Sequence, residues 1–275
     1  MPNTTFSTLR DVDRDLDFLV ESASPEVRDK ERLKQILRQD EDFRGKYVAD
    51  DKVFRKLMDD DEILLKISPR LFFEILLRRA ATDLEGVGYT FEKSSSMKVP
   101  VFDTQEVVEL LSQESLLIYL AEMLSSFTRI ESYALSFLVR KGVWKKIRFN
   151  DLDIHSLMAL CDVVENALRL GFYKRIADIC LFMLGIYPDF AERDHRYPFS
   201  GQLRPNLPGR TRISPEEYQR EGQRFYRLAA EHDSAKQGEL SEVFWTLHDH
   251  FQKAKKPLNF IAEHYLQYKR ESFFI

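Results

Sequence analysis

Residues 176–187 read IADICLFMLGIY, and this apolar stretch sets the expectation for the whole fold. On a helix it is apolar nearly all the way round, interrupted only by Asp178 and Gly185. A helix that is hydrophobic on every side is either enclosed by other helices or spans a membrane. The stretch is far shorter than the roughly 20 residues that a bilayer requires. We therefore predict that a helix near 172–186 is the most buried element of a helical protein.

The segments on both sides of this stretch carry signals of helix starts. Ser24, Ser68 and Ser214 each come directly before a proline, so each hydroxyl can cap a helix whose first residue is that proline. Asp103 is followed by Glu106 at the spacing of a capping box. Apolar residues recur at helical spacing after several of these starts. We therefore predict an all-α fold, a multi-helix bundle around the central apolar helix.

Further helices are predicted at 115–141, 152–169 and 257–271. Two segments are predicted to be non-helical, 85–100 and 187–213. The second is longer than most loops in compact domains, and loops of that length are usually functional or disordered. It is therefore a candidate for function.

Charge is distributed unevenly along the chain. The formal net charge is −4, and up to Lys66 there are 17 acidic and 13 basic residues, whereas residues 67–275 hold 28 of each. We therefore predict an acidic helical N-terminal subdomain or arm over residues 1–66 and a main all-α domain over residues 67–275. An acidic chain has no general attraction for nucleic acid or anionic membranes, so any such binding must be local.

The composition is that of a folded chain. Hydrophobic residues make up 44% and aromatic residues 12%, which excludes the disordered class. Cys161 and Cys180 fall in apolar helical patterns, where a free cysteine behaves as a small hydrophobe, so we predict no disulfide. The first residues contain no apolar secretory leader, and we expect a cytoplasmic protein without a membrane partner.

The fingerprints of common enzyme chemistry are missing from the sequence. It contains no glycine-rich phosphate loop, no HExxH, no paired CxxC and no GxSxG. His248 and His250 are two residues apart, so they do not face the same way from a helix. We therefore predict no bound metal and no cofactor, and we do not expect an enzyme of a common class.

Two short segments resemble the signature of the HEPN class of helical ribonucleases, an arginine and a histidine separated by four to six residues. Arg148 with His155 and Arg227 with His232 have this spacing. The resemblance implies that the guanidinium holds a phosphate while the imidazole moves a proton during attack by a 2′-hydroxyl. Phe149 stands where that family tends to carry a polar residue, and pairs of this spacing also arise by chance. A metal-independent ribonuclease is the alternative to a binding function.

Two basic clusters are the leading candidates for a binding surface. The first is free of acidic residues and is interleaved with Trp144 and Phe149. Aromatic residues among bases suit a surface that stacks bases and neutralises phosphates. The structural alternative is that these bases close a helix at its C-terminus and fill an interhelix turn. The first cluster consists of Arg140, Lys141, Lys145, Lys146 and Arg148.

The second cluster lies in the predicted 187–213 loop. Its prolines stiffen the loop, and arginine offers forked donors for carboxylate or phosphate. The same arginines could equally bind this chain's own acidic N-terminal segment, at residues 40–42 and 59–62. The second cluster consists of Arg193, Arg196, Arg204, Arg210 and Arg212.

Together, the clusters predict a non-catalytic interaction or regulatory protein that binds an acidic partner, either a protein or a nucleic acid. A second feature concerns assembly. The segment 116–120, LLIYL, is apolar on more than one side of its helix, and this favours a homodimer.

Overall fold

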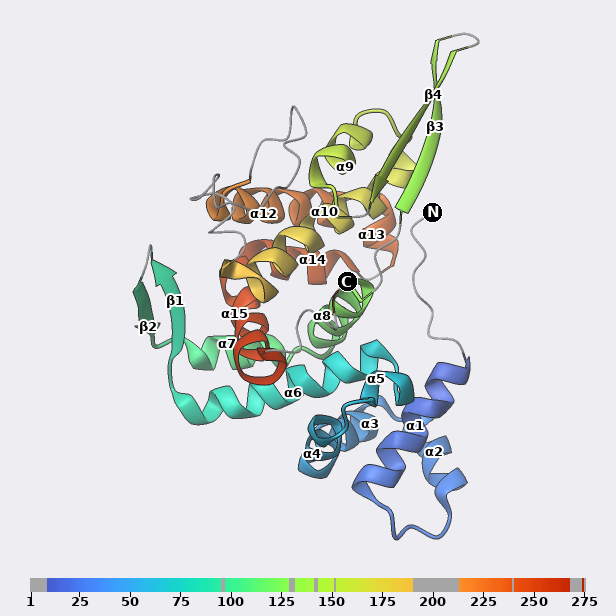
Figure 1. Ribbon diagram of the computed structural model, residues 1–275, viewed down its shortest axis with the longest axis vertical. Coiled ribbons are helices and arrows are strands. Elements are labelled where there is room, and N and C mark those ends of the chain that lie inside the picture. Colours follow the sequence, from blue (N-terminus) through green and yellow to red (C-terminus); the bar gives the residue numbers. More distant parts are fainter. Residues whose placement is uncertain are drawn as a thin grey trace. The chain divides into compact units, whose positions relative to one another are not determined.

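The structure is a computed structural model, and it describes residues 9–94, 97–128, 132–140, 143–150, 152–189, 213–238, 240–267 and 274. Helices make up most of these residues, and the strands form two separate hairpins (Figure 1). The predicted all-α multi-helix fold is therefore confirmed.

The chain divides into two compact units. Unit 1 holds the described residues within 129–255 together with residue 274, and unit 2 holds those within 3–128 and 256–270. The domain boundary expected at residue 67 stays a prediction. Among the described residues, no helix is both long enough and apolar enough to cross a lipid bilayer.

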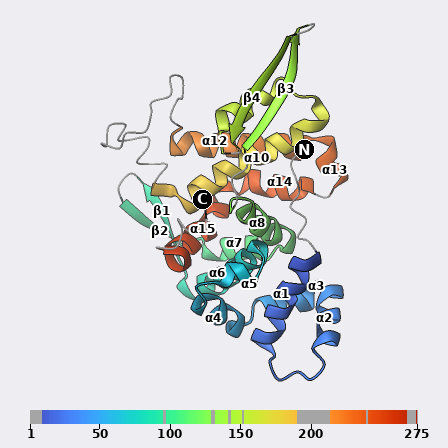
Figure 2. The same cartoon turned by 45° about the vertical axis from the view of Figure 1, so that its right-hand side comes forward.

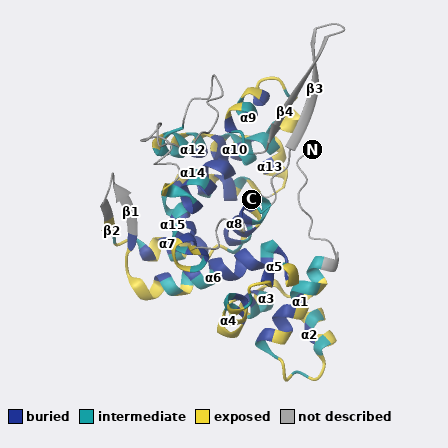
Figure 3. Ribbon diagram, viewed as in Figure 1, coloured by how far each residue is buried: buried dark blue, intermediate teal, exposed yellow. Residues whose placement is uncertain are grey.

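Unit 2 is organised around the long helix α6, Pro69–Val87. Buried positions lie along most of α6, and they include Phe73, Leu76 and Leu77 (Figure 3). The remaining elements of unit 2 are α1 (Leu9–Ala23), α2 (Lys30–Gln39), α3 (Glu41–Val48), α4 (Asp51–Asp59), α5 (Ile63–Lys66), β1 (Thr90–Ser94), β2 (Met97–Val101), α7 (Thr104–Leu111), α8 (Glu114–Ser126) and a π-helical turn (Ala262–Leu266).

Helix starts follow the sequence signals in part. The Ser68 hydroxyl accepts a hydrogen bond from the backbone N–H of Leu71 at 3.1 Å, and the Ser214 hydroxyl accepts one from Glu217 at 3.1 Å, so both predicted caps are confirmed. The start predicted at Ser24 is wrong: Pro25 lies in a turn, and α2 begins at Lys30 with Asp29 as its cap. The Asp29 carboxylate accepts a backbone hydrogen bond there, and the Ser24 hydroxyl instead contacts the Tyr47 hydroxyl.

The segment between α6 and α7 is a β-hairpin. Gly88 ends α6 with φ 73°, a left-handed conformation that glycine adopts without steric cost. β1 then pairs with β2 in an antiparallel register that places Thr90 opposite Val101. For the described residues of 85–100, the expected non-helical character is therefore confirmed except for the last turn of α6.

Unit 1 is organised around α10, Asn166–Ile186, which contains the apolar stretch. From Ile176 to Ile186 every residue is buried except the half-buried Met183. α10 packs against α12, and α12 packs against α14. The remaining elements of unit 1 are β3 (Ser132–Arg140), β4 (Val143–Asn150), α9 (Ile154–Cys161), α12 (Pro215–Glu231), α13 (Asp233–Gln237), α14 (Leu240–Asp249) and the start of α15 (Phe251–Ile261), which ends in unit 2.

Three predicted helix boundaries are wrong. The helix expected at 115–141 ends at Ser126, and the rest forms β3, because SYALSFLVR alternates small and large residues with the period of a strand. The break expected near 170 is absent: α10 runs through Gly171, since one glycine costs a helix only about 1 kcal/mol. Pro257 lies inside α15 and does not start a new helix.

Candidate functional site

The first basic cluster lies on a two-stranded β-ribbon, and not at the helix end and interhelix turn that the structural alternative assumed. Arg140 is the last residue of β3, and Lys145, Lys146 and Arg148 lie in β4. Lys141 lies outside the described residues. Dipole interactions with a helix C-terminus therefore do not account for these bases.

The pairing register sorts the ribbon into two rows. In antiparallel strands, directly opposed residues share a face and successive residues alternate between faces. Arg148 pairs with Ala134, Lys146 with Ser136 and Trp144 with Leu138, and these rungs alternate along the strands and form one row, the basic row. The other row pairs Phe149 with Tyr133, Ile147 with Leu135 and Lys145 with Phe137. The register thus separates a row with two bases and a tryptophan from a mainly apolar row.

The ribbon extends beyond the helices of unit 1. Figure 1 and Figure 2 both show β3 and β4 running past α9. The sheet has these two strands and no third among the described residues. The bases of this cluster therefore lie on a projecting element of the fold.

The second basic cluster cannot be placed in the same way. Its five arginines, Arg193, Arg196, Arg204, Arg210 and Arg212, all fall between 190 and 212, outside the described residues. Their pairing with the acidic N-terminal segment stays a prediction.

The two Arg–His pairs occupy different settings. Arg227 is exposed on α12, whereas His232 is buried and uses both ring nitrogens within the protein. Its Nδ1 accepts a hydrogen bond from the backbone N–H of Ser234 at 3.2 Å, so its Nε2 donates to the carbonyl of Asn166 at 2.9 Å. His155 is exposed on α9. His232 thus caps α13 and connects it to α10.

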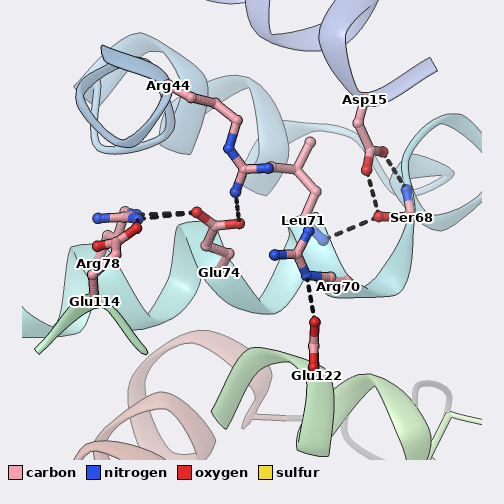
Figure 4. A network of polar contacts seen from close by, with 9 residues as sticks. All are labelled: Asp15, Arg44, Ser68, Arg70, Leu71, Glu74, Arg78, Glu114 and Glu122. Carbon is pink, nitrogen blue, oxygen red and sulfur yellow. Dashed lines mark hydrogen bonds and ion pairs between the residues drawn. The ribbon is translucent and has the colours of Figure 1, made fainter. Parts of the chain in front are cut away.

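A charged network along α6 was missed by the sequence reasoning (Figure 4). The Glu74 carboxylate is 1% exposed, and it accepts hydrogen bonds from Arg44 at 2.7 Å and from Arg78 at 3.1 Å. Arg78 also pairs with Glu114, the first residue of α8. An added Cβ at Gly45 would lie 3.3 Å from the Arg78 guanidinium, so the small residue makes room for it. The network connects α3, α6 and α8 within unit 2.

One sequence signal could have revealed this network. Glu74 interrupts the apolar run LFFEILL, and a carboxylate in such a run is almost never buried without a partner. Asp178 is the equivalent signal in unit 1: it is fully buried in α10 and accepts hydrogen bonds from Tyr226 at 2.9 Å and from Lys174 at 2.6 Å. Both networks are closed by protein groups, and their role is to join helices.

A third polar centre in unit 2 joins the α7 N-terminus to α15. Asp103 precedes α7, but its side chain makes no capping hydrogen bond. The carboxylate instead accepts a hydrogen bond from Thr90 at 2.5 Å and pairs with the buried amine of Lys256. The helix start predicted after Asp103 is therefore confirmed, but the capping hydrogen bond predicted for the Asp103 side chain is wrong. Burial alone would raise the pKa of Asp103, but Lys256 and Thr90 lower it overall below 3.8.

Asp103→Asn is expected to destabilise unit 2 by about 2 kcal/mol at pH 7, the value of a hydrogen bond between charged groups. A carboxyl whose pKa is lower in the folded state stabilises the fold above its unfolded pKa and loses this effect as the pH falls through its folded value. The difference between variant and wild type should therefore shrink below pH 3.8. Denaturant unfolding at a series of pH values measures it, with the exposed Asp42→Asn as control. A difference that stays constant into strong acid contradicts the prediction.

Both cysteines are free and buried. Burial raises the pKa of the Cys161 thiol to about 11 and raises that of Cys180 as well. Neither thiol is therefore activated as a nucleophile. Within the described part of the chain, His, Cys, Asp and Glu side chains do not gather in any group of three or more that could hold a metal ion.

The chain matches no protein-family model, no curated protein and no solved structure.

Proposed function

We propose that this chain is a non-catalytic interaction protein that binds an acidic partner, a nucleic acid or an acidic protein segment, through the β3–β4 ribbon. The observation that supports this most directly is the register, which aligns Trp144, Lys146 and Arg148 in one row. No Asp or Glu occurs between residues 132 and 150. The ribbon sequence itself is therefore positively charged, although the whole chain is acidic.

The geometry suits binding to an extended, negatively charged chain. A two-stranded ribbon is narrow enough to enter a nucleic-acid groove, and successive rungs of one row of a strand lie about 7 Å apart. Basic residues neutralise phosphates or carboxylates, and an aromatic residue in the same row provides a stacking face. Steering by this local charge would operate against the repulsion expected from the net charge of −4.

Changing Lys145, Lys146 and Arg148 together to alanine is expected to weaken nucleic-acid binding at least tenfold. The slope of log affinity against log salt should fall by about 1.4, because the basic row supplies two phosphate contacts, Lys146 and Arg148, and each contact on a single strand contributes about 0.7. Fluorescence anisotropy with labelled single-stranded RNA and DNA across a salt series measures both quantities. The matched control changes Lys46, Lys52 and Lys236, three exposed bases on helices, to alanine.

If the ribbon variant and the helix control variant lost equal affinity for nucleic acid, net charge alone would drive binding. This result would overturn the proposal. Binding of a polyglutamate probe in place of nucleic acid, lost in the same variant, would identify an acidic protein partner. Cleavage of the RNA on a gel, abolished by His155→Ala or His232→Ala, would establish the ribonuclease alternative.

The homodimer and the cytoplasmic location stay predictions, although Leu116, Leu117, Tyr119 and Leu120 are buried within this chain.

A further inference from the structure

The β1–β2 hairpin of unit 2 presents exposed aromatic residues at its base. Tyr89 and Phe102 directly flank the paired strands, and their rings meet edge to face with centroids 6.4 Å apart. The exposed fraction is 84% for Phe102 and 37% for Tyr89. Large aromatic rings are normally among the more buried side chains of a folded protein. A ring pair that stays this exposed indicates a surface for contact with another molecule.

The register shows which residues share the face of this ring pair. Phe91 lies opposite Pro100 and Lys93 lies opposite Lys98, at alternate positions from Tyr89 and Phe102. We call these three rungs the outer row. Pro100 is exposed. The outer row therefore contains an aromatic pair, an aromatic–proline rung and a pair of lysines, without an acidic residue.

One rung of the opposite row contacts the rest of unit 2, and this rung shows which face of the hairpin the outer row occupies. Thr90 lies opposite Val101 and is buried, and its hydroxyl donates a 2.5 Å hydrogen bond to Asp103. Asp103 is in turn paired with the buried Lys256. Glu92, the acidic residue of β1, belongs to this inner row. Because successive residues of a strand alternate between faces, the register assigns the outer row to the face opposite Thr90.

We infer that the outer row of β1–β2 binds a single-stranded nucleic acid, with bases stacked on Phe102 and Tyr89 and backbone phosphates at the positions of Lys93 and Lys98. Stacking of bases on aromatic rings next to basic residues is the general way in which proteins hold single strands. A protein partner fits this face less well, because a stable protein interface needs about 800 Å² on each side, far more than one exposed ring pair offers. The face belongs to unit 2, whereas the β3–β4 ribbon belongs to unit 1.

The decisive variant is Phe102→Leu, which keeps apolar bulk and removes the ring. Affinity for a short fluorescein-labelled oligothymidylate should fall about tenfold, within the range expected for loss of one stacked base. The salt slope should stay unchanged, because no charge is altered. Phe102→Trp should restore binding. In contrast, changing Lys93 and Lys98 to alanine should lower the slope by about 1.4, since each phosphate contact contributes about 0.7.

The outcome separates this inference from the proposed function when the variants are combined. Residual binding in the Lys145/Lys146/Arg148 triple alanine variant that is further weakened by Phe102→Leu supports the outer row. Wild-type affinity in Phe102→Leu, or a loss that Phe102→Trp does not restore, overturns the outer row and leaves the β3–β4 proposal standing. A normal triple variant together with a weakened Phe102→Leu variant overturns the β3–β4 proposal alone. Absence of oligothymidylate and oligouridylate binding at low salt overturns the nucleic-acid assignment of both ribbons.

Discussion

Replacing Glu74 with alanine is expected to lower the free energy of unfolding of unit 2 by about 3 kcal/mol. The carboxylate is 1% exposed, and it is the shared acceptor for Arg44 and Arg78. Removing one partner of a buried ion pair leaves a desolvated charge without compensation, which costs about 3–5 kcal/mol. The lower end applies because Arg78 keeps Glu114 as a partner. Glu74 is therefore expected to contribute more to stability than a typical exposed ion pair, which is worth about 0–1 kcal/mol.

Hydrogen exchange read peptide by peptide is the suitable measurement, because a chain of two units need not unfold in one step. Protection in α6 and α3 should fall, while α10 in unit 1 serves as an internal reference. Glu114→Gln is the matched control: the carboxylate is 43% exposed, and the expected loss is about 0.5 kcal/mol. Equal losses in Glu74→Ala and Glu114→Gln would show that burial of the Glu74 carboxylate does not set its contribution.

The second large effect is expected at Gly222 in α12. A Cβ at this position would lie 2.5 Å from the ring of Phe251 and 2.9 Å from the Cβ of Cys180. Both neighbours are fully buried, so neither can move aside into solvent. Overpacking of this kind costs about 3 kcal/mol, and we expect Gly222→Ala to destabilise unit 1 by that amount. The higher helix propensity of alanine recovers only about 1 kcal/mol.

Gly238→Ala is the control for this variant within the same unit. Its Cβ would meet the Ser234 carbonyl oxygen at 3.4 Å, an ordinary contact, and its backbone has a φ of −104° that any residue adopts. Stability should therefore change by less than about 0.5 kcal/mol. Hydrogen-exchange protection in α10 and α12 measures the stability change in both variants. If Gly222→Ala also changed the stability by less than about 0.5 kcal/mol, α10 and α12 would pack less closely than the distances indicate.

The two ribbons differ in how far the sequence could reveal them. The bases and aromatics of residues 140–149 are visible as a cluster in the sequence, but their strands are not, because SYALSFLVR directly continues the apolar pattern of the helix before it. The outer row of β1–β2 was not identified, since nothing in TFEKSSSMKVP shows which residues oppose one another. Register, and with it the composition of each face, follows from pairing between strands.

The all-helical class, the central helix and two of the capped helix starts follow from local chemistry. Periodic burial, a serine hydroxyl before a proline and an apolar run are properties of neighbouring residues, so the sequence was sufficient for them. Three carboxylates have hydrogen-bond partners that are distant in the sequence. Arg44 is 30 residues from Glu74, Tyr226 is 48 residues from Asp178, and Lys256 is 153 residues from Asp103. Such pairings depend on how helices pack, and helix packing depends on all the side chains of a unit at once. The folded arrangement was therefore needed to show which charges are buried and which aromatic rings are left exposed.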